Sequence, residues 1–479
     1  MTGLNKISIT LGALILTAIF GFFNYTRMEY LGLFPLVLLF LYFAIYETTR
    51  FFLAIAFFTP LSVNIEEYTD NFGLFLPTEP LLFGLMIFFV FMQIKRPFLD
   101  PKIWKNPIII TVLIYLLWLL ITAVTSTDPL VSFKYILAKL WFLIPVLIFG
   151  TYFFRKHENR VRFLWLFVIS CCLVVCFTLF HHSLYGFGEE EGHWVMWPFF
   201  KDHTIYGATL AICLPISLAL LRQRGSPPLS KAILILLNVV LVVGLVFSYT
   251  RAAWLSVICA GVVGLIVHFK VNFKFLFGAS LALGLLIYSQ WDSIQLSLAK
   301  NKHEHTTDAF DEKIQSAANV TTDASNLERI NRWDCAYQMF LKKPFIGFGP
   351  GTYAFEYAPF QDPENLTIIS TNFGDMGNAH SEYLGALSET GIVGLVLFLS
   401  IVGSVFYCSI RLYYGTAKDK KDERILIMGI IISLSSYFIH AFLNNYLDTD
   451  KAAVPIWAMC AMIVTMSLSS SSDQSIERG

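Results

Sequence analysis

The chain has 479 residues, of which 56% are hydrophobic and only 14% are charged, and its mean hydropathy is +0.63. This composition excludes an ordinary set of soluble domains and indicates a protein that lies within a lipid bilayer. Lysine and arginine balance aspartate and glutamate, so the net charge is zero and gives no reason to expect a nucleic-acid partner.

Apolar runs long enough to cross hydrocarbon as helices recur along the whole chain. In chain order we expect fourteen spans: Ile7–Phe23, Leu31–Tyr46, Phe51–Val63, Leu81–Met92, Ile108–Val124, Tyr135–Phe153, Phe163–Phe180, Ile205–Leu221, Ala232–Phe247, Ala252–His268, Phe273–Tyr288, Ile392–Tyr407, Ile425–Leu443 and Ala452–Ser467. The third and fourth are short, so the expected number is twelve to fourteen. Ile7–Phe23 lacks a strongly basic start and a small-residue cleavage site, so we expect a span there and not a signal peptide. The predicted fold is an all-α polytopic membrane protein.

Lysine and arginine are unevenly distributed between alternate loops. The loops at 95–106, 154–162, 222–231, 268–274 and 411–424 contain 18 of them, whereas five intervening loops contain 4. Because positive charge stays on the cytoplasmic side, both termini should be cytoplasmic and the long segment from residue 290 periplasmic. The predicted parts are an N-terminal transmembrane bundle (1–289), one large periplasmic helical loop (290–390), and C-terminal transmembrane helices with a cytoplasmic tail (391–479).

The periplasmic segment contains an amphipathic helical pattern followed by a glycine-rich turn. From Leu327 onward, apolar side chains recur at helical spacing: Ile330, Trp333, Tyr337 and Phe340. This spacing predicts a helix that buries that face. Pro344 and the glycines of GFGPG should end the helix in a tight turn. GFGPG is not followed by Lys-Ser/Thr, so we do not interpret it as a phosphate-binding loop.

The stretch GNAHSEYLGALSETGIVGL, residues 377–395, predicts a second helix over Ala379–Thr390, with Asn378 as its N-cap and Gly391 as its stop. His380 would then lie in the first turn, where the helix macrodipole disfavours an imidazolium. A neutral imidazole can accept a proton as a general base. The alternative is a histidine that packs at the membrane interface.

Two arginines are suited to an anionic ligand. Arg251 begins a hydrophobic helix on the face where positive charge is otherwise scarce, so it either snorkels to the interface or has an anionic partner. Arg329 would face the same surface if the loop folds back onto the membrane; the alternative is an exposed helix charge. We expect Arg332, Lys342 and Lys343 to be solvated or to contact lipid headgroups.

Other candidate residues carry weaker signals. His203 and Tyr206 open an outer-face span and could contact a sugar or phosphate, although a structural role is the alternative for both. Tyr383 shares the helical face of His380. The histidines of HHSLYGFGEEEGHW and NKHEH lack the spacing of a ligand set, so no metal site is expected. Seven of the eight cysteines fall in apolar runs and only Cys335 lies in a polar region, so no disulfide framework is expected either.

Taken together, Arg251 in SYTRAAW, Arg329 in ERINRWDCAYQMFLKKPFIGFGPGTY and His380 in NAHSEYLGALSETGIVGL resemble the O-antigen ligase and polymerase family of bacterial inner membranes. The resemblance implies an inner-membrane glycosyltransferase with a periplasmic active site that uses neither a metal nor a cofactor. Its donor would be a glycan linked to undecaprenyl diphosphate, and its acceptor a sugar hydroxyl of the lipid A core or of another glycan. It also implies that His380 takes the acceptor proton while Arg251 and Arg329 hold the pyrophosphate.

Ligase and polymerase differ in their acceptor, and the sequence does not separate them. A lipid-linked glycan flippase or another transporter would also explain the spans, but it would need ionisable groups near the bilayer midplane, where the apolar runs contain almost none. A scaffolding membrane protein would not require the histidine and both arginines. The expected partners are the lipid-linked donor, the glycan acceptor and membrane lipids, and no nucleic acid.

Overall fold

The computed structural model describes residues 45–65, 73–224, 227–272, 324–362 and 377–476, with isolated positions at 42, 274, 278, 285, 289 and 290. The expected spans Ile7–Phe23, Phe273–Tyr288 and nearly all of Leu31–Tyr46 lie outside the described residues. Within them, regular structure is helical apart from one antiparallel pair of short strands, β1 (Val63–Asn64) and β2 (Phe75–Leu76).

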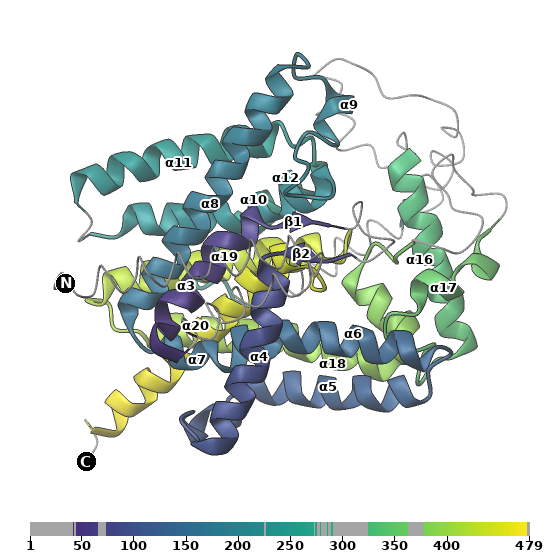
Figure 1. Cartoon of the computed structure of the whole chain (residues 1–479), viewed down its shortest axis with the longest axis horizontal. Helices are drawn as coiled ribbons and strands as arrows, with labels where there is room; N and C mark the ends of the chain where they lie inside the picture. Colours follow the sequence, from purple (N-terminus) through teal and green to yellow (C-terminus); the bar gives the residue numbers. More distant parts are fainter. Residues whose placement is uncertain are drawn as a thin grey trace, which may run out of the picture.

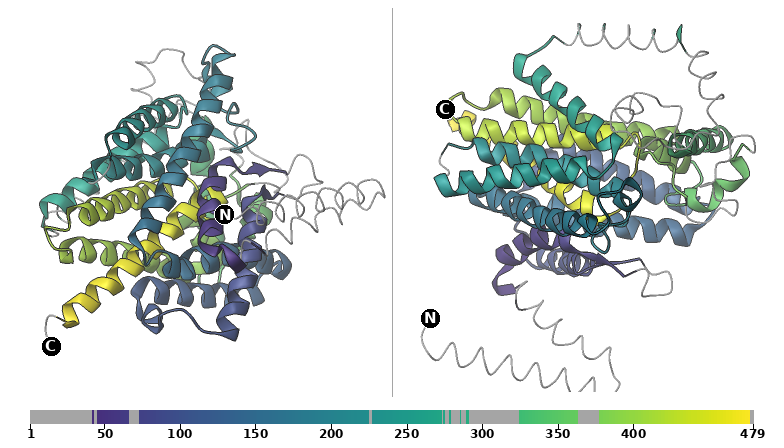
Figure 2. Two further views of the ribbon diagram at one scale, coloured as in Figure 1. Left: turned by 60° about the vertical axis from the view of Figure 1, so that its left-hand side comes forward. Right: turned by 90° about the horizontal axis from the view of Figure 1, so that it is seen from above.

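The helices in chain order are α3 (Thr48–Leu61), α4 (Thr78–Lys95), η3 (Pro101–Lys105), α5 (Pro107–Val124), α6 (Pro129–Phe142), the π-helix η4 (Leu143–Ile148), α7 (Gly150–Phe153), α8 (His157–Ser183), α9 (Glu189–Gly192), α10 (His203–Arg222), α11 (Pro228–Val246), α12 (Arg251–Phe269), α16 (Ala324–Lys342), α17 (Tyr353–Glu356), η5 (Ala358–Phe360), α18 (Glu382–Gly415), α19 (Lys421–His440) and α20 (Asp450–Ile476). Most of them are long and lie roughly parallel to one another, in alternating directions (Figure 1, Figure 2).

Ten helical segments of the described chain are long and apolar enough to span a membrane, and the protein is an all-α polytopic membrane protein, as predicted. α3 is a shorter apolar helix of 14 residues. α4 has 18 residues, so the fourth span was predicted too short, because its polar end residues Thr78, Glu79 and Lys95 interrupt the apolar pattern but remain helical. Another span runs continuously over Pro129–Phe153 through η4, where Pro145 lies within the wider π-turn.

The bundle has a buried centre and an exposed periphery. α10 and α20 each bury 83% of their most apolar window, whereas α11 and α12 bury only 28%. Small residues let the central helices approach closely. A Cβ added at Gly429 of α19 would lie 2.4 Å from the Cβ of Ala219 in α10. The Ser433 hydroxyl donates to the Ile212 carbonyl at 2.8 Å. α10, α19 and α20 therefore form the core against which other helices pack.

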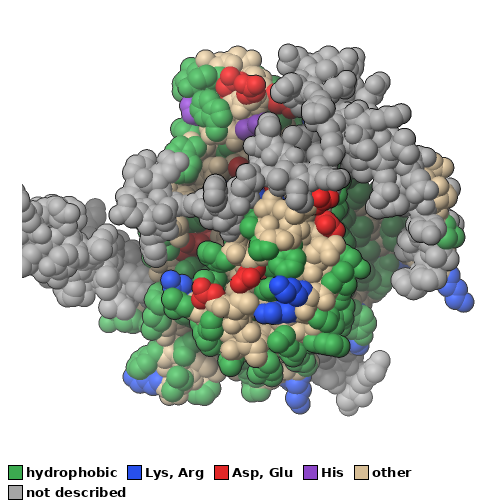
Figure 3. Space-filling model, turned by 90° about the vertical axis from the view of Figure 1, so that its right-hand side faces the viewer, with side chains coloured by type: hydrophobic (Ala, Val, Ile, Leu, Met, Phe, Trp, Pro, Cys, Tyr) green, Lys and Arg blue, Asp and Glu red, His purple; other side chains and the backbone are tan. Residues whose placement is uncertain are grey.

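The helix ends meet at two opposite faces of the bundle (Figure 1). One face, which we name the basic end, contains the helix ends that carry Lys95, Arg222, Lys270 and Lys421. The other, the site end, contains the N-termini of α10, α12, α18 and α20, and α16 and α17 cover part of it (Figure 1). Viewed directly, the site end has acidic and basic side chains near its middle, with hydrophobic side chains around them (Figure 3).

Candidate functional site

α16 covers the site end with a face that differs from the predicted one. The helix itself is confirmed over Ala324–Lys342. Tyr337, expected to be buried, is 49% exposed, and Trp333 is half-buried. The buried side chains are Glu328, Asn331, Arg332, Cys335, Ala336 and Met339. Half of these buried side chains are polar, so the spacing of apolar residues alone could not predict that this face is buried.

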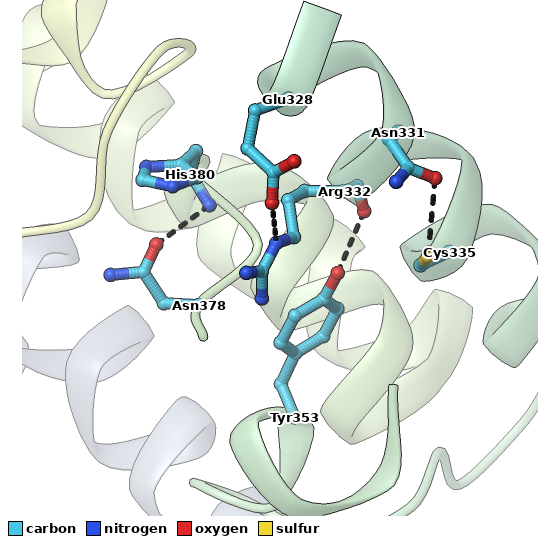
Figure 4. A network of polar contacts seen from close by, with 7 residues as sticks. All are labelled: Glu328, Asn331, Arg332, Cys335, Tyr353, Asn378 and His380. Atoms are coloured by element: carbon cyan, nitrogen blue, oxygen red, sulfur yellow. Dashed lines mark hydrogen bonds and ion pairs between the residues drawn. The ribbon is translucent and has the colours of Figure 1, made fainter. Parts of the chain in front are cut away.

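Arg332 lies at the centre of that buried face, so the prediction of a solvated side chain was wrong. It is 4% exposed, its Nε lies 2.7 Å from Glu328 Oε1, and its guanidinium lies 4.1 Å from the centroid of the Tyr357 ring. The Tyr353 hydroxyl donates to the Arg332 carbonyl at 2.8 Å (Figure 4). A Cβ added at Gly377 would lie 1.5 Å from Arg332 Nη1. These contacts hold the chain that leads into α18 tightly against α16.

The second predicted helix begins three residues later than expected. α18 starts at Glu382, and the Ser381 hydroxyl accepts a first-turn backbone N–H at 3.4 Å, so Ser381 and not Asn378 is the N-cap. Asn378 instead closes a local turn, because its Oδ1 accepts the His380 N–H at 2.9 Å (Figure 4). His380 has a left-handed φ of 45°, and its carbonyl accepts from Trp333 Nε1 at 3.4 Å. The histidine therefore lies just outside the helix, on a turn that α16 holds.

His380 has a neutral imidazole, as predicted, but for a different physical reason. Burial lowers its pKa from 6.5 to about 4 and is the largest cause; the positive charges of Arg329 and Arg332 act in the same direction. The negative charges of Glu328 and Asp202 oppose the shift but are outweighed. The dipole of α18 is not required, because His380 precedes the first turn.

The two candidate arginines both lie at the site end. Arg329 is half-buried on α16, and its charge acts on both His380 and the Tyr446 hydroxyl. Arg251 is the first residue of α12, and the backbone that follows it lies against the His440 ring at the end of α19. The first turn of α12 carries no acidic residue. Arg329 therefore lies close enough to His380 for its charge to act on the imidazole, whereas Arg251 lies at a neighbouring helix end.

The three weaker candidates fall into two groups. His203 begins α10 at the site end, where it is half-buried and its ring stacks on the exposed His193 ring at 4.2 Å. Tyr206 is 1% exposed within the core of the bundle. Tyr383 is also buried, and its hydroxyl donates to the Phe438 carbonyl at 2.9 Å. Both tyrosines thus have packing contacts in this structure.

Sequence reasoning missed a chain of hydroxyl contacts that joins α10 to the loop after α19. Asp202 caps α10 and accepts from the Thr204 hydroxyl, which in turn contacts the Tyr446 hydroxyl. The Tyr446 ring stacks on His440 at 6.0 Å. An aspartate directly before an apolar run is a readable N-cap signal. Tyr446 carries no such signal, because its partner Thr204 is 242 residues away.

Glu382, also missed, joins the start of α18 to the same loop. Its Oε1 accepts from the Tyr437 hydroxyl at 2.8 Å and from the N–H groups of Tyr446 and Leu447 at 2.9 and 2.8 Å. The Glu382 N–H donates to the Ala441 carbonyl at 2.9 Å. One carboxyl group thus connects α18, α19 and the loop that carries Tyr446.

A polar cavity of about 180 Å³ opens beside the His380 turn. Its polar lining residues are Tyr115, Tyr135, Tyr353, Asn378, Ser381, Glu382, Glu389, Thr390, Asn445 and Asp448. Hydroxyl, amide and carboxyl groups of this kind pair well with the hydroxyls of a sugar. In the described part of the chain, no group of three or more His, Cys, Asp or Glu side chains is placed to hold a metal ion.

The GFGPG segment, residues 347–351, is a turn as predicted, and it clamps α18 at its break. The Phe348 N–H donates to the Ser388 carbonyl at 3.2 Å, and the Phe348 carbonyl accepts from the Thr127 N–H at 2.8 Å. The predicted stop at Gly391 is confirmed as a break, with φ 71° and ψ −173°. A Cβ there would lie 2.2 Å from the Phe345 carbonyl oxygen, so only glycine fits. This clamp also forms one wall of the polar cavity.

These observations define a polytopic helical membrane protein in which a neutral histidine and arginines gather where the ends of several helices meet α16. Residues 236–399 match the family model described as O-Antigen ligase, and the matched segment contains Arg251, Arg329 and His380. This segment, about a third of the chain, is therefore similar to the O-antigen ligase family, and the match supports a glycosyltransferase-type enzyme of a membrane. A comparison with curated proteins gives no match.

Proposed function

We propose that this protein transfers a glycan from undecaprenyl diphosphate to a sugar hydroxyl of an acceptor, as an O-antigen ligase. The observation that carries the proposal is the half-buried, neutral imidazole of His380, on which the charge of Arg329 acts, next to a polar cavity. A sugar hydroxyl is a poor nucleophile until a base removes its proton, and a departing diphosphate is stabilised by positive charge. The site end offers a candidate base, His380, and candidate positive charges, Arg329 and Arg251, for these two requirements.

In the proposed step, the acceptor hydroxyl oxygen attacks the anomeric carbon of the donor sugar. The bond from that carbon to the diphosphate oxygen breaks, its electron pair leaves with undecaprenyl diphosphate, and the acceptor proton moves to His380. Arg329 and Arg251 hold the diphosphate, because each guanidinium can offer two parallel N–H donors to phosphate oxygens. Their charges and the N-terminus of α12 supply the field, so the proposed step uses neither a metal nor a cofactor.

We place the acceptor sugar in the polar cavity, whose lining residues Asn378 and Ser381 flank His380 in the chain. Glu382 and Glu389 would accept hydrogen bonds from sugar hydroxyls there. The acceptor is either a lipid A core, for a ligase, or the end of another glycan, for a polymerase of the same family. His203, half-buried at the site end, remains a candidate contact to the donor, while Tyr206 and Tyr383 would support the site by packing.

We further propose that the site end is periplasmic and the basic end cytoplasmic, in the bacterial inner membrane with both termini cytoplasmic. The three-part division at 289/290 and 390/391 belongs to the same proposal. Reporter fusions after Gly225 and after Lys421 should be cytoplasmic, and one at Asn319 should be periplasmic. A periplasmic signal at Lys421 would overturn this orientation.

A flippase or transporter has less support, because its ionisable groups should lie near the middle of the spans. Glu79 and Asp450 are buried but lie in the first turns of α4 and α20, at helix ends. Lys451 follows Asp450, and its Nζ donates to the carbonyls of Thr59 and Ser62 at 2.6 and 2.8 Å. These buried charges join α20 to the end of α3, which is a structural use.

His380→Gln tests the proposed base. Glutamine keeps the hydrogen-bonding capacity but cannot take the proton, so transfer of a lipid-linked glycan in proteoliposomes should fall by roughly 10² to 10⁴. Donor binding should persist, because the arginines remain. His181→Gln is the matched control: His181 lies at the site end of α8, with Nδ1 3.0 Å from the Val195 carbonyl, outside the proposed machinery. Transfer by His380→Gln within a few-fold of wild type would rule out the base.

A further inference from the structure

An apolar groove opens at the basic end, far from the chemistry proposed above. It has a volume of about 520 Å³ and lies between α10, α12 and α19. Its walls include Pro215 and Leu218 of α10, Val257 and Gly261 of α12, and Met428 and Ile432 of α19. A Cβ added at Gly261 would meet nothing within 4 Å, so this wall borders open space.

The length of the groove along α12 is about half the thickness of the hydrocarbon core of a bilayer. The lining residues of α12 extend from Val257 to His268, a rise of roughly 16 Å at the helical 1.5 Å per residue. The hydrocarbon core of a bilayer is about 30 Å thick. The groove therefore reaches from the basic end to about the middle of the bilayer, which is the depth that one acyl chain of one leaflet occupies.

The mouth of the groove is basic. Its arginine, lysine and histidine lining residues are Arg222, Arg224, His268, Lys418, Lys421 and Arg424, and no aspartate or glutamate lines it. All of these side chains are exposed except Arg424, which is half-buried. Arg424 is held in place, because its Nη1 donates to the carbonyls of Tyr413 and Thr416 at 3.1 and 2.8 Å.

The nearest acidic groups do not cancel this charge. Asp422 and Glu423 lie in the first turn of α19, outside the groove lining, and Asp422 Oδ1 accepts the backbone N–H of Arg224 at 2.9 Å. With Asp419, which is exposed and follows Lys418 in the chain, three carboxylates thus stand beside five lysine and arginine side chains at the mouth. An apolar groove one leaflet deep with a cationic mouth at its interface is complementary to a lipid with an anionic headgroup.

We propose that this groove binds an anionic glycerophospholipid of the leaflet at the basic end. One acyl chain lies against Leu218, Val257 and Ile432, and the phosphate lies between Arg222 and Lys421. A soluble anion would leave the apolar walls uncovered, and a zwitterionic lipid would leave the cationic mouth without a matching net charge. The site is independent of the transferase site, so neither proposal depends on the other.

Native mass spectrometry of the detergent-purified full chain tests the proposal, with dioleoyl phosphatidylglycerol and dioleoyl phosphatidylcholine offered together. Wild type should retain the anionic lipid preferentially. The double variant Arg222→Gln/Lys421→Gln should reduce that preference by roughly 25-fold, about fivefold for each charge. Lys95→Gln/Arg96→Gln removes two exposed charges at the same end but outside the groove, and should leave the preference unchanged.

A second variant tests the apolar part. Gly261→Phe places a ring in the open space of the groove and should reduce retention of both lipids. Three results would overturn the proposal: equal retention of the two lipids by wild type, an equal loss of preference in the control double variant, or unchanged retention in Gly261→Phe. Glycerol phosphate, which has the headgroup charge without the chains, should not compete; effective competition by it would also overturn the lipid assignment.

Discussion

Arg329→Gln should move the acid limb of the transfer reaction's pH profile to higher pH. In the free protein the pKa of His380 is about 4, so the base is deprotonated throughout the neutral range. Burial is the main cause, and the positive charge of Arg329 is the next. Removal of that charge makes the imidazolium less unfavourable, so the proton binds at higher pH and the base is lost earlier as the pH falls.

Coulomb's law sets the size of the shift. At an effective dielectric constant of about 20, two like charges about 10 Å apart repel each other by about 1.7 kcal/mol, which corresponds to about one pH unit, so we expect a shift of that order. Because burial remains, the limb should stay below the ordinary histidine value of 6.5. A bound diphosphate offsets the same charge, so in wild type the acid limb of kcat should lie above that of kcat/KM.

The assay is kcat/KM for glycan transfer over the range from about pH 3 to about pH 9, normalised to each variant's plateau because Arg329→Gln also loses donor affinity. Lys342→Gln is the control, since this exposed lysine lies at the far end of α16, 5.3 Å from the centroid of the Phe360 ring. Acylation of His380 by diethyl pyrocarbonate, followed by peptide mass spectrometry, reports the same pKa without turnover. An unchanged limb in Arg329→Gln by both measurements would refute the electrostatic coupling.

Three further predictions concern the packing around α18 and the binding of the diphosphate by the arginines. Glu382→Ala should lower the thermal unfolding midpoint in detergent, because three donors lose their acceptor at about 1 kcal/mol or more each; Glu382→Gln keeps Oε1 and should lose much less, so equal midpoints would contradict the role. Gly377→Ala should impair folding and transfer, because its Cβ would lie 1.5 Å from Arg332 Nη1, whereas Gly403→Ala, whose Cβ would meet nothing within 4 Å, should behave as wild type. Arg251→Lys and Arg329→Lys should each lose about tenfold or more in transfer rate, because an ammonium cannot make the bidentate contact; wild-type rates in both, at normal protein levels, would favour snorkelling.

The amino-acid sequence is enough to predict that the protein lies in a membrane, and it predicts most of the described helices. Spans such as Pro107–Val124 can be predicted from the length of the apolar run. The breaks at GFGPG and Gly391 can be predicted because glycine and proline favour turns and interrupt helices. The arginines and the histidine were also readable, because their flanking residues carry a family pattern. The length of an apolar run, the spacing of its apolar residues and the backbone preference of each residue depend only on residues close together in the chain, so a single sequence is enough to read them.

Contacts between side chains of different helices could not be predicted in the same way. The sequence predicted a solvated Arg332, but the side chain is buried because Glu328, Tyr357 and Gly377 surround it. The sequence predicted that a helix dipole keeps His380 neutral, yet burial under α16 and two arginines do so instead. The partners of Arg332 and His380 either lie far away in the chain or are polar residues that a pattern of apolar residues does not include. Buried polar contacts depend on angles and distances between distant segments, and neither hydrophobic periodicity nor loop charge encodes those.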